Sequence, residues 1–238
     1  MNHFDTLIQK VPDIEAKIRY SFHDKSLITL AFIHRSYVNE HKEVTDHNER
    51  LEFLGDSVLG LIVSDYLYRE LPQTPEGDLS YLRSRLVEAS SCCQYIQKLK
   101  VEPFILLGKG ERLNEGRGRE TILADLFEAI VGAIYLDGGL EATRTFIFGH
   151  FQEDITAILR MPLQNWKAAL QDFCQRNYQQ QPEYSVLSES GPDHSKIFRI
   201  KVSIGKKELG NGEGSSKKSA QQAAAQDALE RMKENHGN

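Results

Sequence analysis

The segment Ile122–Leu136 constrains the fold of this chain more than any other. It is the longest apolar run in the sequence, and a helix built from it is apolar on every side. Such a helix belongs in the middle of a protein core. The run is too short to cross a bilayer, so we expect no membrane span. Its only charged residues are Asp125 and Glu128, which an i, i+3 spacing places on one side of the helix.

A second acidic face is predicted on a helix that begins near Asn48. At 100° per residue, one face carries three carboxylates, Glu49, Glu52 and Asp56. The opposite face is apolar and consists of Leu51, Leu54, Val58, Leu61 and Ile62.

Buried carboxylates need a hydrogen-bonded or cationic partner, because desolvating an unpartnered charge is very unfavourable. If the two helices pack together, four carboxylates converge: Glu52, Asp56, Asp125 and Glu128. A hard, oxygen-preferring dication such as Mg²⁺ or Mn²⁺ suits such a set. A site of this kind, without Cys or His ligands, is typical of phosphodiester hydrolysis, because the metal lowers the pKa of a bound water and holds phosphate oxygens.

Two structural interpretations of the acids stay open at this point. The first acidic face could be a solvated stripe in which Glu49 reaches back to form a capping box after Asp46. Alternatively, Arg50, Arg83 or Arg85 could form buried ion pairs with the acids. The glycine-containing segment 108–118 fits no phosphate-cradling pattern, and we interpret it as a basic loop able to touch a substrate backbone.

The order of predicted elements indicates two domains. The first part is all-α, with breaks at 39–46, 71–78 and 108–119. The tail is α-β-β-β-α: a helix over 165–177, strands over 184–189 and 198–204, a turn at 205–207 into a third strand, and a helix capped by Ser215 and Ser216. The net charge also differs between the two parts: it is −7 for residues 1–160 and +2 for residues 161–238.

The tail carries polar and basic groups suited to duplex RNA. Lys217 and Lys218 begin the last helix, where free backbone N–H groups and the helix dipole favour phosphate. Gln171 and Gln175 form an i, i+4 pair able to reach ribose hydroxyls across a minor groove, and His194 lies at a turn with the same reach.

The three cysteines, Cys92, Cys93 and Cys174, suggest no disulfide framework, and the first ten residues lack a secretory pattern. We therefore expect a reduced, cytoplasmic protein.

The residues of both parts resemble bacterial ribonuclease III. The run His47–Leu59 is similar to the signature of that family, and the similarity continues through Glu76-Gly77, 119–125 and 128–135. The tail resembles a double-stranded-RNA-binding domain through Leu170-Gln171, 191–194 and 216–220. The sequence departs from the family at 165–168, where an acid often precedes the lysine and a threonine follows it; this affects only helix capping.

The resemblance implies a Mg²⁺-dependent homodimeric endoribonuclease, with Mn²⁺ as a possible substitute, that cuts duplex RNA to 5′-phosphate and 3′-hydroxyl ends in a staggered manner. It also implies processing of ribosomal, messenger and transfer RNA precursors. The implied domains are a catalytic domain over 3–158, a linker over 159–163 and an RNA-binding domain over 164–234. The family motifs further imply that Glu52, Asp125 and Glu128 bind metal and that Asp56 and Glu128 are catalytic. They give Glu76 and Glu111 an outer or second-metal role. The implied RNA contacts are Gln171, Gln175, His194, Lys217 and Lys218.

Two other functions share part of these features. A non-catalytic duplex-RNA binder would use the acidic helices only for folding, although every expected carboxylate is present. A metal-dependent phosphatase would share the acidic centre but would leave the tail unexplained. Incubation with duplex RNA and Mg²⁺, with EDTA as control, distinguishes the three.

Overall fold

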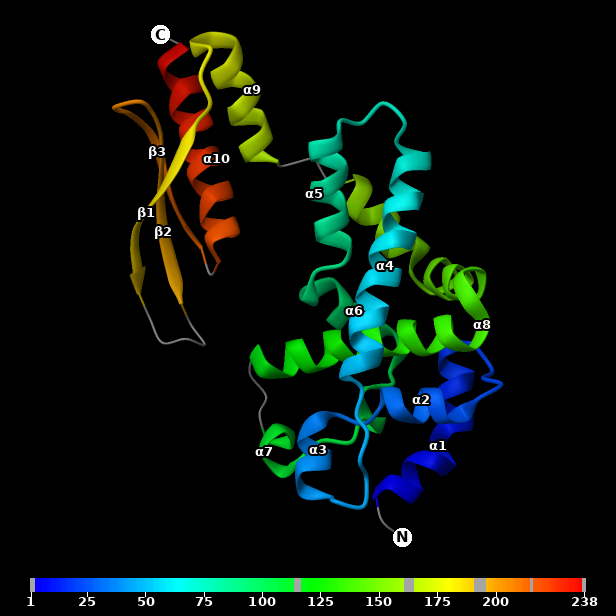
Figure 1. Ribbon diagram of the computed structural model, residues 1–238. Coiled ribbons are helices and arrows are strands. Elements are labelled where there is room, and N and C mark those ends of the chain that lie inside the picture. The colour runs from blue at the N-terminus through cyan, green and yellow to red at the C-terminus, as the bar shows by residue number, and fades with distance from the viewer. Residues whose placement is uncertain (1–2, 114–116, 161–164, 191–195, 215, 237–238) are drawn as a thin grey trace. The chain divides into compact units, whose positions relative to one another are not determined.

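The structure is a computed structural model that describes residues 3–113, 117–160, 165–190, 196–214 and 216–236. The chain forms two compact units, Met1–Met161 (unit 1) and Pro162–Asn238 (unit 2). Unit 1 is helical and unit 2 is α-β-β-β-α (Figure 1), so the predicted fold class is confirmed. The helices of unit 1 are α1 (His3–Ile18), α2 (Lys25–Ala31), α3 (Arg35–Glu40), α4 (Glu49–Glu70), α5 (Glu76–Leu86), α6 (Ala89–Leu99), the 3₁₀ turn η1 (Glu102–Phe104), α7 (Lys109–Arg112) and α8 (Arg117–Arg160).

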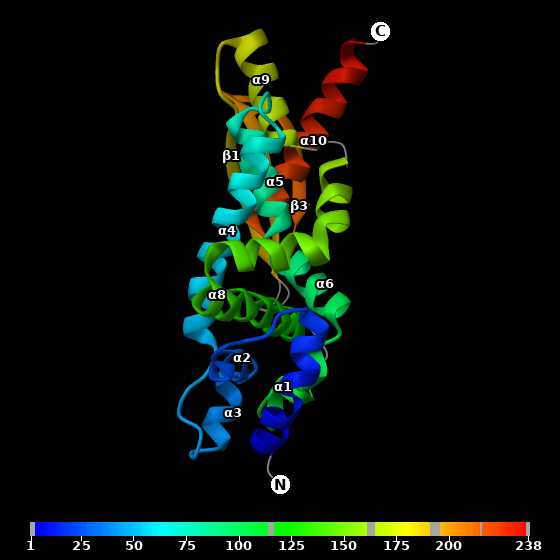
Figure 2. The ribbon, with the colours of Figure 1, turned by 90° about the vertical axis from the view of Figure 1, so that its right-hand side faces the viewer.

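The long helix α8 contains the predicted core helix. The side chains of Phe127 and Ile130 are fully buried, as the apolar pattern requires. Gly139 interrupts the helical backbone with φ 76° and ψ −171°, a conformation that favours glycine, and divides α8 into two helical stretches. The helix packs mainly against α4 and α6 (Figure 2). The acidic run 125–128 thus lies at the centre of unit 1.

Helix α4 differs from the prediction at one residue of its apolar face. Leu51, Val58 and Ile62 are buried, but Leu61 is 56% exposed. The core contacts α4 along the row that Leu51, Val58 and Ile62 form, and Leu61 lies to one side of that row. The prediction that Leu61 faces the core was wrong.

Two of the predicted breaks also contain helix. Helix α5 begins at Glu76, within the predicted break 71–78, and the four-residue helix α7 lies within the predicted loop 108–119. So short a helix leaves no periodic pattern, which explains why the sequence indicates only a loop there.

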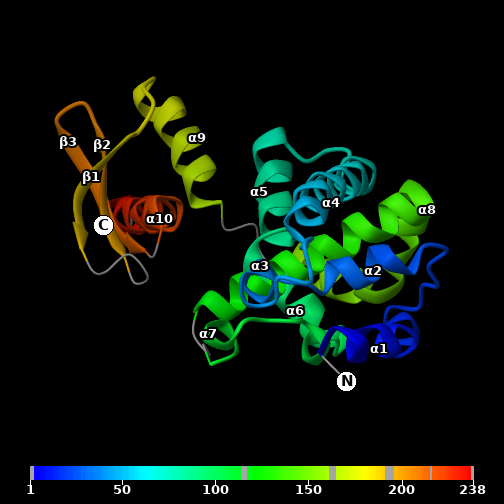
Figure 3. The same ribbon diagram turned by 60° about the horizontal axis from the view of Figure 1, so that its bottom comes forward.

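Unit 2 consists of a three-stranded antiparallel sheet with two helices. Its elements, seen from another direction in Figure 3, are α9 (Trp166–Tyr178), β1 (Glu183–Ser190), β2 (Ile197–Ile204), β3 (Lys207–Gly214) and α10 (Lys217–His236), and the strand order is β1-β2-β3. Ile200 and Val202 of β2 are buried with alanines of α10, so the intervening Lys201 faces the other side of the sheet. The predicted turn at 191–194 lies outside the described residues.

The caps of the two helices of unit 2 are polar side chains. Asn165 Oδ1 accepts a hydrogen bond from the Ala168 amide at 3.2 Å. Ser216 Oγ accepts one from the Ser219 amide at 3.1 Å, as predicted for this cap, whereas Ser215 lies outside the described residues.

All three cysteines are free and buried. No helix among the described residues has the length and apolar character needed to span a membrane.

Candidate active site

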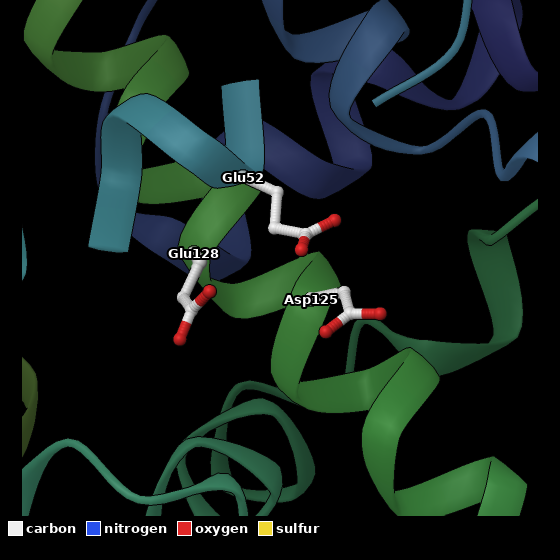
Figure 4. Close-up of side chains that lie close together, drawn as sticks. All are labelled: Glu52, Asp125 and Glu128. Atoms are coloured by element: carbon white, nitrogen blue, oxygen red, sulfur yellow. The ribbon is translucent and has the colours of Figure 1, made fainter. Parts of the chain in front are cut away.

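The crossing of α4 and α8 brings three of the predicted metal ligands together. Glu52 projects from α4 toward Asp125 and Glu128 of α8 (Figure 4). One carboxylate oxygen from each of the three lies within 4.8 Å of the others, and all three residues are half-buried. Acids more than 70 residues apart in the sequence therefore share one small space.

Glycine allows this close crossing. A Cβ atom placed on Gly132 of α8 would lie 2.3 Å from the carbonyl oxygen of Leu51, far inside van der Waals contact. The backbones of the two helices therefore touch, one residue away from Glu52 along α4. Each helix accepts a glycine in its interior, at a cost of about 1 kcal/mol relative to alanine, because only glycine allows that contact.

Each of the three acids has a pKa well above its ordinary value. Burial is the main cause for all of them. The pKa of Glu128 rises to about 8, with Asp56 the largest contributor among the neighbouring charges. The pKa of Glu52 rises to about 7, with a further contribution from the charge of Asp125. The pKa of Asp125 rises to about 6, with a further contribution from the charge of Glu49. The protein thus holds mutually repelling negative charges in a partly desolvated place, where a cation would relieve the repulsion.

The alternative of buried arginine pairs finds no support here. Among the described residues, no lysine or arginine forms an ion pair with Glu52, Asp125 or Glu128. Arg83 donates to Ser64 Oγ at 3.4 Å, and Arg85 lies 3.7 Å from Glu88.

The alternative that the acidic face of α4 is a stripe in solvent applies only to Glu49 and Asp56. Glu49 lies 3.3 Å from the guanidinium of Arg35 and forms no capping box, because the N-cap residue of α4 is Asn48. Asp56 is exposed and lies outside the group of three, although its charge acts on Glu128. The expected convergence of four carboxylates is therefore a group of three with Asp56 beside it.

The two outer acids lie apart from this group. Glu76 is exposed in the first turn of α5, where it accepts a hydrogen bond from Ser80 at 2.8 Å. Glu111 is half-buried on α7, where its charge acts on His34. Within this chain, the structure does not bring either residue into the group of three.

Carboxylate oxygens are the ligands that Mg²⁺ and Mn²⁺ prefer, and the raised pKa values show that a positive charge would stabilise the ionised forms. The residues present therefore fit a hard divalent cation. A site with these ligands can lower the pKa of a bound water and neutralise a phosphodiester oxygen.

Four of the five predicted RNA contacts in unit 2 belong to the described residues, and all four are exposed. Gln171 and Gln175 lie on one face of α9, and Lys217 and Lys218 begin α10. His194 lies outside the described residues. Lys217 Nζ lies 5.7 Å above the ring of Phe198, a contact that stabilises the ammonium group near the helix N-terminus.

One further basic group in this region, Lys167, was not predicted from the sequence. Burial lowers the pKa of Lys167, and the charge of Lys218 lowers it further, so the two ammonium groups are neighbours. Lys167 Nζ donates to Gln221 at 2.7 Å, which connects α9 to α10. Its position directly after Trp166, at the start of a predicted helix, gave no signal of this proximity.

Comparison with known proteins agrees with both halves of the structure. Residues 24–155 match the family model described as Ribonuclease-III-like, and residues 166–232 match the double-stranded RNA binding motif. The chain is 66% identical over 232 residues to Ribonuclease 3 of Protochlamydia amoebophila, an alignment that covers 98% of this chain and 96% of the relative. The chain belongs to the ribonuclease III family.

Other relatives of the family agree. Ribonuclease 3 of Streptococcus gordonii is 47% identical and covers 90% of this chain and 92% of its own length. Among solved structures, the nuclease domain of ribonuclease III from Campylobacter jejuni is 38% identical with a TM-score of 0.54, and the match covers 59% of this chain and 94% of that domain. As a ribonuclease III with both domains, the chain is a double-stranded-RNA-specific endoribonuclease.

Proposed function

We propose that this ribonuclease III hydrolyses phosphodiester bonds of duplex RNA at the α4–α8 crossing, with Glu52, Asp125 and Glu128 as ligands of Mg²⁺, for which Mn²⁺ can substitute. The observation that carries the proposal is the approach of their three carboxylates to within 4.8 Å, without a basic partner among the described residues. When bound, the metal lowers the pKa of water and neutralises phosphate oxygens.

The chain's own groups hold the reactants and move protons. We assign catalytic roles to Glu128 and Asp56. Without metal, burial and the charge of Asp56 raise the pKa of Glu128 to about 8; a bound dication would favour its ionised form, which can hold the metal and orient the attacking water. Asp56 is exposed beside it and can contact water or substrate directly. Glu76 and Glu111 would act outside the group of three, in an outer or second-metal role.

The catalytic domain in this proposal extends over 3–158, the linker over 159–163 and the RNA-binding domain over 164–234. In the RNA-binding domain, Gln171, Gln175 and His194 would contact ribose hydroxyls in the minor groove, and Lys217 and Lys218 would contact phosphates. Such contacts read the shape of the duplex and leave its sequence largely unread.

We further propose a homodimer whose interface includes α4. Phe53 is 78% exposed, Tyr68 is 74% exposed, and with Leu61 they form an apolar strip along one side of that helix. Large exposed apolar side chains on one side of a helix are typical of an interaction surface. The Campylobacter jejuni nuclease domain is described by its region involved in dimer formation. Two active sites in such a dimer would give a staggered cut.

The products in this proposal carry 5′-phosphate and 3′-hydroxyl ends, and the substrates are ribosomal, messenger and transfer RNA precursors. We propose a cytoplasmic location, in keeping with three cysteines that are all free thiols.

The test compares Glu128→Gln with Glu141→Gln, a control on the same helix whose side chain is 84% exposed. Labelled duplex RNA is incubated with each protein and Mg²⁺, with EDTA as a second control, and binding is measured without divalent ions. We expect Glu128→Gln to abolish cleavage and to bind RNA normally, whereas the control cuts normally. Cleavage at the normal rate by Glu128→Gln would refute the assignment. Binding without cleavage by the unmodified protein would favour the non-catalytic binder.

A further inference from the structure

A cavity whose lining does not include Glu52, Asp125 or Glu128 (the acidic group) lies between α1, α3 and the segment from η1 to α7. Its volume is about 220 Å³, several times the ~30 Å³ that one water molecule occupies in the liquid. Leu7 and Phe104 contribute apolar walls. Helices α1 and α3 lie at the same end of unit 1 in both Figure 1 and Figure 2. None of the proposed metal ligands or RNA contacts lines this cavity.

Tyr37 supplies a polar group to this cavity that the fold does not use. The residue is 1% exposed, yet its hydroxyl has no hydrogen-bond partner within the described part of the chain. Its ring stacks on His41 at 4.1 Å between centroids, so the side chain is held in place. The amide of Phe4, in the first turn of α1, faces the same oxygen and partly offsets the rise in the pKa of Tyr37 that burial causes. The hydroxyl hydrogen is still without an acceptor. A buried donor of this kind is unfavourable unless something else accepts its hydrogen.

The other ionisable groups that line the cavity are all nitrogen bases. They are His3, Lys10 and Arg112. Arg112 has no ion-pair partner among the described residues, and Lys10 is half-exposed and lies 2.8 Å from Asp13. Asp5 and Glu43 act on Tyr37 from nearby, but neither lines the cavity.

We propose that this cavity binds a phosphate group, with the Tyr37 hydroxyl and the Arg112 guanidinium as its principal donors and Lys10 at its rim. A guanidinium can donate two parallel hydrogen bonds to phosphate oxygens, and the tyrosine hydroxyl can donate a third. The apolar walls leave space for an attached organic group. The phosphate could come from a free ion or a nucleotide, or it could be the terminal phosphate of an RNA strand.

The experiment uses the full chain with Lys217→Ala and Lys218→Ala, which removes the proposed phosphate contacts of unit 2, and with EDTA, so that no metal draws phosphate to the acidic group. Titration calorimetry measures binding of inorganic phosphate, of adenosine 5′-monophosphate against adenosine, and of a hairpin RNA with a 5′-phosphate against one with a 5′-hydroxyl. The variants are Tyr37→Phe, which removes only the hydroxyl, and Arg112→Gln. Lys17→Gln, an exposed lysine elsewhere on α1, is the control.

We expect saturable binding at one site per chain that weakens at least about fivefold in Tyr37→Phe and in Arg112→Gln and is unchanged in Lys17→Gln. Stronger binding of the monophosphate than of adenosine identifies a free nucleotide as the source. A preference confined to the 5′-phosphorylated hairpin identifies an RNA end. Absence of saturable binding by all three phosphate-bearing ligands, or equal binding by all variants with unchanged unfolding temperatures, would overturn the proposal. Because the active site is not needed for this measurement, the result is independent of the cleavage test.

Discussion

A Cβ atom on Gly55 of α4 would lie 1.8 Å from the backbone carbonyl oxygen of Glu128 on α8. No side chain could be accommodated at that distance without moving one helix. The glycine therefore contacts the residue whose carboxylate belongs to the proposed metal site. The separation of the two helices, and with it the approach of Glu52 to Asp125 and Glu128, is set by glycines at the crossing.

Alanine at the other glycine of the crossing should open the site. In Gly132→Ala, the new methyl group would meet the Leu51 carbonyl at 2.3 Å and force α4 away from α8. Overpacking of this kind destabilises a protein by about 1–3 kcal/mol. We expect that loss of unfolding free energy together with a Mg²⁺ affinity about tenfold lower, comparable to the loss when outer partners of metal ligands are removed. Denaturant unfolding and metal titration measure the two effects.

Gly149→Ala is the matched control, because a Cβ at that position of the same helix meets nothing within 4 Å. It should gain up to about 1 kcal/mol from helix propensity. Equal Mg²⁺ affinity in both variants would show that the crossing does not set the geometry of the site.

The acidic group should make the metal-free protein less stable as pH rises. The folded-state pKa values of Glu52, Asp125 and Glu128 are raised to about 7, 6 and 8, so the folded state binds more protons than the unfolded state between about pH 4 and pH 8. Stability contributed by these groups therefore falls with increasing pH across that window. A bound dication favours the ionised forms, so the rise in Tm on adding Mg²⁺ should grow from pH 5 to pH 8.

Thermal unfolding with Mg²⁺ and with EDTA at each pH checks this expectation. In Glu128→Gln, which cannot ionise at that position, the EDTA curve should decline less with pH. A Mg²⁺-induced shift in Tm that is constant from pH 5 to pH 8 would contradict it.

The fold could be predicted from the sequence where one element determined its own environment. The apolar run Ile122–Leu136 predicted a core helix. In β2, apolar Ile200 lies between polar Arg199 and Lys201, and this alternation indicated which side of the strand is buried. The grouping of Glu52 with Asp125 could be predicted too, because Asp125 interrupts an otherwise apolar helix and needs a cation, and the acidic face that carries Glu52 offers further carboxylates to hold one. The glycines inside the two helices were a further available signal, since Gly55 and Gly132 lower helix propensity without a local reason.

Features that depend on tertiary contacts could not be predicted. The exposure of Leu61 depends on which row of α4 the core contacts, and a helical period alone does not distinguish adjacent rows. Likewise, the Tyr37 hydroxyl hydrogen has no acceptor among the described residues because of how three distant segments pack. The exposed position of Asp56, one turn beyond Glu52 on α4, depends on where α8 crosses that helix, which neither sequence encodes locally.

Removal of the two lysines at the start of α10 should weaken RNA binding without changing sequence preference. Lys217→Ala with Lys218→Ala removes two proposed phosphate contacts, so the slope of log affinity against log salt should become shallower by about two. Lys201→Ala is the control, because Lys201 faces away from α10 across the sheet. Gel-shift titrations with duplexes of different sequence at several salt concentrations measure both quantities. An unchanged slope in the double variant would exclude these lysines from the interface.

A charge on the exposed strip of α4 should dissociate the proposed dimer. Leu61 is 56% exposed and lies more than two helical turns from Glu52 along α4, so Leu61→Asp should leave the fold and the metal ligands intact. In a dimer interface the same carboxylate would be desolvated without a partner, which should weaken association at least about tenfold. Sedimentation velocity over a range of concentrations measures the oligomeric state. Leu113→Asp, at a position that is 84% exposed outside α4, is the control and should stay dimeric. If both variants sediment like the unmodified protein, the strip is not part of the interface, because a buried aspartate could not be accommodated there without cost.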